Sequence, residues 1–164
     1  MRKRIAIFGG SLFQDIKLEK NTYRTTAKQA VVRLAKCYDI DNYSMEDMSI
    51  RRAFRLIQSL PVQGLYNDCI LALGEADLGN VEEFRNLLPQ IISYLLNRDI
   101  RPLLVSLPKD LLNQEEARNI QSIIDDCAVA YNIDYIYEGN TSKTVSYVVL
   151  DDHEMGQAIV ALCN

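Results

Sequence analysis

The sequence predicts an α/β protein with a parallel sheet that is covered by helices on both faces. Two short apolar runs that end in glycine, Ile5 to Phe8 and Cys69 to Leu73, are typical of buried strands at the centre of such a sheet. Segments with helical period alternate with strands along the chain, and the connections are long enough for parallel crossovers. We therefore expect a three-layer αβα sandwich with five parallel strands in the order 2-1-3-4-5.

The other elements follow from the spacing of apolar residues. Helices, with apolar residues three and four apart, are expected over about 22–38, 49–60, 81–97, 114–131 and 152–162. The remaining strands are expected near 40–45, 102–107 and 134–137. Pro89 lies inside a predicted helix, and because proline removes a backbone donor we expect a kink or two shorter helices there.

Composition limits the domain organisation and the partners. With 164 residues, of which 48% are apolar, the chain can bury a sizeable core as one domain, 1–164. The net charge of -4 and the scattered cations argue against nucleic acid as the main partner. The apolar run after Arg4 is too short for a signal-peptide core or a membrane span. We expect a cytoplasmic protein without a membrane partner, and the oligomeric state stays open.

The cysteines give no sign of a metal site. Cys37, Cys69, Cys127 and Cys163 lie far apart, without a CxxC pair, and the chain has one histidine to join them. Each has apolar neighbours, as a small buried residue in a reducing compartment would. We expect reduced, largely inaccessible thiols, and neither a metal nor another cofactor.

Ser11 is the first candidate for chemistry. It follows the first predicted strand directly after Gly9 and Gly10, and ligands of open parallel sheets bind at the carboxyl ends of the strands. The two glycines allow the backbone to adopt positive φ or to approach a ligand closely. The alternative is that these three residues form only a turn and a helix cap.

Two further stretches should meet Ser11 at the same rim of the sheet. They are the loop from Gly74 to Asp77 and the entrance to the last helix at 151–153. His153 is the single histidine, so any machinery that pairs a serine with a histidine must use it. A serine hydroxyl needs a neighbouring base to take its proton, and an imidazole held by an acid suits that task.

Asp151 and Asp152 are the candidates for the acid that orients His153. The alternative for this stretch is a helix start, with Asp151 as N-cap, Glu154 completing a capping box, and His153 exposed in the first turn.

The chain resembles the SGNH, or GDSL-type, hydrolases in three blocks. They are GGSL at 9–12, LGEADL at 73–78 and DDHEMG at 151–156, whose order and spacing span essentially the whole chain. The resemblance implies a flavodoxin-like αβα sandwich, a nucleophilic serine, oxyanion donors and an aspartate-histidine pair near the C-terminus. It also implies that the substrates are esters and other acyl groups.

Carried over by position, the resemblance makes Ser11 the nucleophile, His153 the base and Asp151 its orienting acid. The substrate and oxyanion loop then comprises Gly10, Gly74, Glu75 and Asp77. Gly10 replaces the family's aspartate, and Ala76 stands where the family has an oxyanion-binding asparagine, so the oxyanion hole is degenerate.

Glu75 and Asp77 are expected to line the pocket and to favour polar or cationic substrates. The alternative is a solvated loop in which Asp77 caps the next helix. The sequence thus predicts an esterase or deacylase that acts on a small acyl ester. The alternative is a catalytically inactive module of the same fold that binds a ligand or a protein, which Ala76 favours. A phosphate or flavin site is weakly indicated, because GGSLFQ lacks the GxGxxG spacing.

Overall fold

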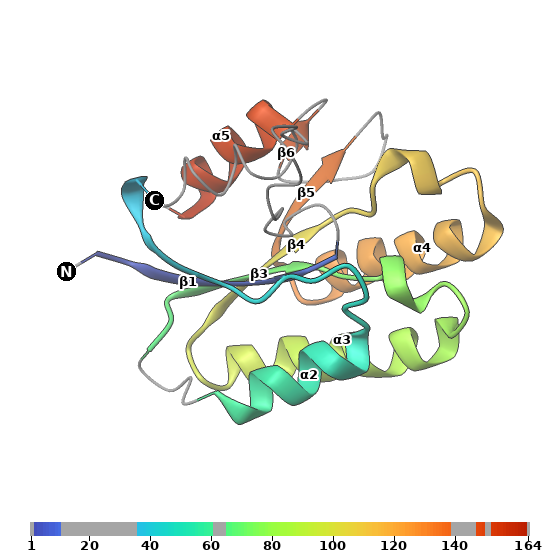
Figure 1. Ribbon diagram of the computed structural model, residues 1–164, viewed down its shortest axis with the longest axis horizontal. Helices are drawn as coiled ribbons and strands as arrows, with labels where there is room; N and C mark the ends of the chain where they lie inside the picture. Colours follow the sequence, from blue (N-terminus) through green and yellow to red (C-terminus); the bar gives the residue numbers. More distant parts are fainter. Residues whose placement is uncertain (1, 11–35, 61–64, 139–146, 150–151, 164) are drawn as a thin grey trace, which may run out of the picture.

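A single parallel sheet of six strands organises the protein. The computed structural model describes residues 2–10, 36–60, 65–138, 147–149 and 152–163. The strands are β1 (Arg4–Gly9), β2 (Asp39–Asn42), β3 (Asp68–Ala72), β4 (Arg101–Val105), β5 (Asp134–Glu138) and β6 (Tyr147–Val149). Their order is β2-β1-β3-β4-β5-β6, which confirms the predicted order of the first five strands (Figure 1). The sequence did not predict β6, which pairs with β5 and extends the sheet.

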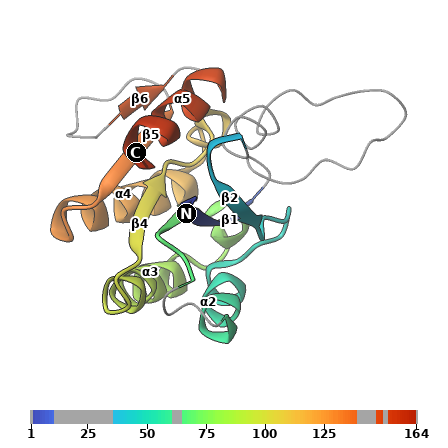
Figure 2. The ribbon, with the colours of Figure 1, turned by 90° about the vertical axis from the view of Figure 1, so that its left-hand side faces the viewer.

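Helices cover both faces of this sheet, as expected for a three-layer sandwich. The helices are α2 (Ile50–Ser59), α3 (Val81–Leu96), α4 (Glu115–Ala130) and α5 (Asp152–Cys163), with the short 3-10 turns η1 (Glu75–Asp77) and η2 (Lys109–Leu111). Helices α2 and α3 lie on one side of the sheet and α5 on the other (Figure 2). The helix expected over 22–38 lies almost wholly outside the described residues.

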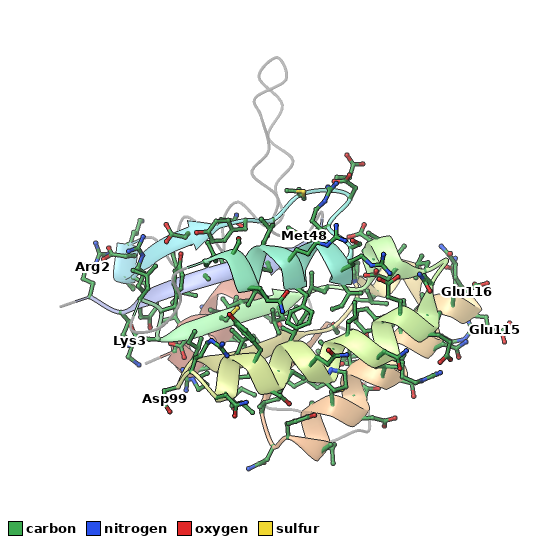
Figure 3. All side chains as sticks on the ribbon, turned by 90° about the horizontal axis from the view of Figure 1, so that it is seen from below. Arg2, Lys3, Met48, Asp99, Glu115 and Glu116 are labelled. Atoms are coloured by element: carbon green, nitrogen blue, oxygen red, sulfur yellow. The ribbon has the colours of Figure 1, made fainter. Side chains whose placement is uncertain are left out.

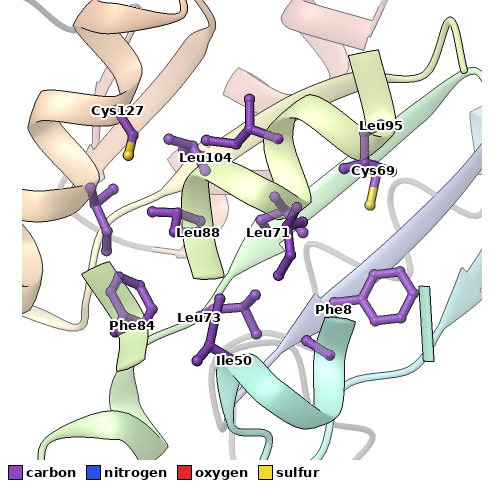
Figure 4. Packing of buried hydrophobic residues seen from close by; sticks show 14 of the residues in the cluster. Phe8, Ile50, Cys69, Leu71, Leu73, Phe84, Leu88, Leu95, Leu104 and Cys127 are labelled. Carbon is purple, nitrogen blue, oxygen red and sulfur yellow. The ribbon is translucent and has the colours of Figure 1, made fainter. Parts of the chain in front are cut away.

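Each face of the sheet has its own apolar core, because successive residues of a strand point to opposite faces. Ala6 and Phe8 of β1 belong to the cluster shared with α2, α3 and α4, part of which is shown in Figure 4. Ile5 and Ile7 belong to the cluster shared with α5, which contributes Ile159. The buried runs that predicted β1 and β3 are therefore covered on both sides, at the centre of the sheet.

Helix α3 continues through Pro89 as one element of 16 residues. Phe84 and Leu88 before the proline, and Ile91 and Leu95 after it, are all buried in the same core. The expected division into two shorter helices does not occur, because this packing holds both halves against one face of the sheet.

Three side chains hold the C-terminal end of α5 at the amino edge of the sheet. The Nζ of Lys3 donates to the carbonyl of Cys163 at 2.6 Å, the Nη2 of Arg101 donates to that of Leu162 at 2.6 Å, and the hydroxyl of Tyr38 donates to that of Val160 at 3.3 Å. Cations at this position also complement the helix dipole. In Figure 3, Lys3 lies at the end of the sheet opposite Glu115 and Glu116, which begin α4. The first turn of α5 therefore lies toward the carboxyl edge.

All four cysteines are free, which confirms the expected thiol state. Cys69, Cys127 and Cys163 are buried, and burial raises the pKa of Cys127 and of Cys163 to about 11. The expectation of an inaccessible thiol is wrong for Cys37, which is exposed.

Candidate functional site

The turn after β1 and the loop after β3 lie side by side at the carboxyl edge of the sheet. The two strands are paired in register up to Gly9 and Ala72. One residue further, the amide of Gly10 donates to the carbonyl of Ala72 at 3.2 Å. The backbone that leads into Ser11 is thus tied to the strand that leads into Gly74, which confirms that these two predicted stretches meet.

The segment after β2 closes the other side of the same turn. The amide of Tyr43 donates to the carbonyl of Ile7 at 2.8 Å, and that of Met45 donates to the carbonyl of Gly9 at 3.0 Å. Between them, the buried hydroxyl oxygen of Ser44 has no hydrogen-bond partner among the described residues. Sequence reasoning missed Ser44 because the strand predicted at 40–45 included it, whereas β2 ends at Asn42 and leaves Ser44 in the segment that follows.

Gly9 and Gly10 lie where a side chain would crowd its neighbours, and neither adopts an unusual backbone conformation. Among the described glycines, positive φ occurs at Gly74 and at neither of these two. A Cβ on Gly9 would lie 3.1 Å from the Cβ of Ala72 and 3.3 Å from the hydroxyl oxygen of Ser44. A Cβ on Gly10 would lie only 2.6 Å from the Oε2 of Glu75. The sequence predicted that these glycines allow a close approach to a ligand. In the structure, the close neighbours of the two glycines include the side chains of Ala72, Ser44 and Glu75.

Gly74 makes the sharp bend between β3 and η1. Its φ of 118° and ψ of -23° lie in a region that other residues rarely adopt. A Cβ at this position would also lie 2.7 Å from the Cγ2 of Ile120 and 3.1 Å from the Cδ2 of Leu107. Both the backbone conformation and the packing against α4 thus demand glycine at the start of the predicted oxyanion loop.

A buried polar network fixes Leu107, whose side chain lies beside Gly74. The amide of Leu107 donates to the Oε1 of Gln121 at 2.9 Å, and the Nε2 of Gln121 donates to the Oδ1 of Asp125 at 3.0 Å. The hydroxyl of Tyr135 donates to the same carboxylate oxygen at 2.6 Å, and burial raises the pKa of this phenol. The network ties α4 to Leu107, just after β4, and to Tyr135 near the start of β5, directly behind the loop.

Asp77 lies beneath the loop, where it caps a helix. Its side chain is 4% exposed, and both carboxylate oxygens accept from the amide of Ile50, each at 3.1 Å. Burial raises the pKa of Asp77 to about 6, and the negative charge of Glu83 adds to this effect while the Ile50 amide opposes it. The capped helix is α2, which precedes the loop in sequence, and not the following helix as one alternative expected. This carboxylate therefore ties the β3 loop to α2.

The remaining predicted catalytic residues are only partly covered by the structure. Ser11 and Asp151 lie outside the described residues, and His153 is described only as backbone in the first turn of α5. The direction of α5 brings that turn toward the edge where Gly10 and Gly74 meet. Whether the serine and histidine side chains face each other stays a prediction.

Two structural features bear on other classes of function. Within the described ranges, no three or more histidine, cysteine, aspartate or glutamate side chains are grouped so that they could hold a metal ion. None of the described helices combines the length and the apolar character needed to cross a membrane.

Solved structures of esterases and lipases share this architecture. A lipase/acylhydrolase from Enterococcus faecalis superposes with a TM-score of 0.69 at 14% identity, covering 97% of this chain and 94% of that chain. A GDSL-like lipase from Bacteroides thetaiotaomicron gives a TM-score of 0.65 at 12% identity, covering 97% and 86%. The SGNH-hydrolase family esterase AlinE4 gives a TM-score of 0.60 at 24% identity, covering 82% and 75%.

The chain adopts the SGNH hydrolase fold. The resemblance seen in its three sequence blocks is thereby confirmed at the level of the fold. No protein-family model matches the chain, and no curated protein matches it. The low identities place it far in sequence from these structural neighbours of the SGNH fold.

Proposed function

We propose that the protein is a serine hydrolase of SGNH type, an esterase or deacylase that cleaves a small acyl ester. One observation carries the proposal: the Gly10 turn, which leads directly into Ser11, is hydrogen-bonded to β3 beside the Gly74 bend. This arrangement lies at the ligand-binding edge of a fold shared with esterases and lipases. The direction of α5, which begins at the same edge, supports His153 as the partner of Ser11.

In the proposed reaction, the hydroxyl oxygen of Ser11 attacks the acyl carbonyl carbon while His153 takes the hydroxyl proton. The tetrahedral intermediate expels the alcohol, which receives that proton from the imidazolium. A water molecule, deprotonated by His153, then attacks the acyl-enzyme. The second tetrahedral intermediate releases the acid, and the Ser11 oxygen takes back the proton from the imidazolium. Asp151 orients the imidazole, with Asp152 as the alternative.

The oxyanion hole explains why we expect slow turnover. Ala76 offers only a methyl group in the loop, and the amide of Gly10 is already bonded to the carbonyl of Ala72. Loss of a single oxyanion donor typically lowers the rate about 100-fold to 1,000-fold. The backbone amides of Ser11 and Gly74 are the donors that we assign to the oxyanion.

The decisive experiment is labelling with a fluorophosphonate probe, followed by peptide mapping. We expect the probe to modify Ser11, and we expect Ser11→Ala to abolish both labelling and the hydrolysis of a short-chain aryl ester. Ser59→Ala, a change at an exposed serine of α2, is the matched control and should leave both unchanged. Equal turnover by the wild type and Ser11→Ala would assign the activity to another site or a contaminant.

The second candidate is an inactive binding module of the same fold, which Ala76 favours because it removes a donor that the reaction needs. Absence of both labelling and turnover in the correctly folded wild type would favour this candidate. The cytoplasmic location predicted from the sequence belongs to the same proposal, and the free thiols support it.

A further inference from the structure

The side chain of Glu75 lies close to the backbone of Gly10. A Cβ on Gly10 would lie 2.6 Å from the Oε2 of Glu75 and 3.5 Å from both its Cβ and its Cδ. The Glu75 side chain therefore lies along the turn after β1, with its carboxylate over the residue that precedes Ser11. The backbone of Gly10 does not adopt positive φ, and a side chain at this position would displace the carboxylate end of Glu75.

Glu75 is the charged residue of η1 whose side chain is partly exposed at this edge. Asp77 is buried and accepts from the amide of Ile50, and Ala76 carries no charge. Glu75 is partly exposed and extends from η1 toward β1. A substrate bound at Ser11 would therefore meet the carboxylate of Glu75, which lies against Gly10, the residue before the proposed nucleophile.

We propose that Glu75, in the space left by Gly10, makes this site selective for acyl esters that carry a cationic group close to the scissile bond. The inference rests on the proposed function, because it names the substrate class of the same site. A carboxylate attracts a cation and repels an anion, and the interaction is stronger near a protein surface than in bulk water. Esters that carry a free carboxylate, such as hemisuccinates, should accordingly be poor substrates.

The test compares two thioesters of similar size and shape, acetylthiocholine and its uncharged analogue 3,3-dimethylbutyl thioacetate. We expect the wild type to favour the cationic ester in kcat/KM by about fivefold or more at low salt, and the preference to shrink at high salt. Glu75→Gln, which keeps the shape and removes the charge, should abolish the preference, mainly through KM.

A second variant moves the carboxylate without removing it. Gly10→Ala places a methyl group where the Oε2 of Glu75 lies, so the flexible end of that side chain must shift. It should reduce the preference for the cationic ester while the fold is retained, as judged by thermal unfolding. Glu82→Gln, at an exposed position on α3, is the matched control and should leave the preference unchanged.

The outcomes separate this inference from the proposed function. Turnover with equal preference in the wild type and Glu75→Gln would overturn the inference and leave the hydrolase proposal standing. If the wild type hydrolyses neither ester, calorimetric binding of the two thioesters to it decides the charge selectivity. Tighter binding of the cationic ester, lost in Glu75→Gln, would support the role of Glu75, and equal binding would overturn it.

Discussion

Replacing Asp77 by asparagine should change how the stability of the fold depends on pH. Burial raises the pKa of this carboxyl from 3.8 to about 6. The folded chain holds the Asp77 proton more tightly than the unfolded chain does. The contribution of protonated Asp77 to the stability of the fold is therefore complete below pH 3.8 and is lost as the pH rises through about 6. A difference of about two pKa units corresponds to roughly 3 kcal/mol.

The Asp77→Asn side chain keeps an oxygen for the amide of Ile50 but does not titrate. The free energy of unfolding of the variant, relative to the wild type, should therefore increase by up to about 3 kcal/mol between pH 3.5 and pH 7. Urea unfolding at a series of pH values measures this difference directly. Asp110→Asn, at an exposed position in η2, is the control and should give a constant difference. A constant difference for Asp77→Asn as well would refute the reasoning.

Three further predictions concern the bend, the anchor of α5 and the thiols. Gly74→Ala should lower the free energy of unfolding by about 2 kcal/mol or more, because positive φ and the contact with α4 both oppose a side chain. Gly79→Ala, where a Cβ meets no atom within 4 Å, should cost far less in the same denaturant titration. Lys3→Met should lower the stability by up to about 1 kcal/mol, since the exposed ammonium group loses its bond to the end of α5, whereas Lys109→Met should not. A thiol reagent should modify Cys37 rapidly in the native protein and the other cysteines only on unfolding, and rapid modification of a second thiol would contradict the structure.

The central part of the fold could be predicted because its signals are local. The apolar run from Ile5 to Phe8 and its glycine stop require no knowledge of distant residues. The strand β6 escaped prediction because three residues are too few to show a period. The prediction of an inaccessible thiol at Cys37 was wrong because apolar neighbours in sequence do not decide which side of an element faces solvent.

The candidate site was harder to predict, because its contacts join distant parts of the chain. Nothing near Asp77 in sequence indicates that its carboxylate accepts from the amide of Ile50, 27 residues earlier. A side chain at position 10 would meet the carboxylate of Glu75, a contact that no local pattern reveals. Sequence motifs thus located the edge of the sheet where the site lies, whereas the partners of its side chains required the three-dimensional arrangement.

Because its C-terminal end is anchored at the amino edge of the sheet, the length of α5 determines the position of His153. Its 12 residues span about 18 Å, and Lys3, Tyr38 and Arg101 hold its last carbonyls in place. One residue inserted within the helix would therefore displace His153 by about 1.5 Å and rotate it by about 100° around the helix axis. This segment should tolerate many substitutions on its exposed side but no change in length, so insertions and deletions here would interfere with any chemistry at His153 while leaving the sheet intact.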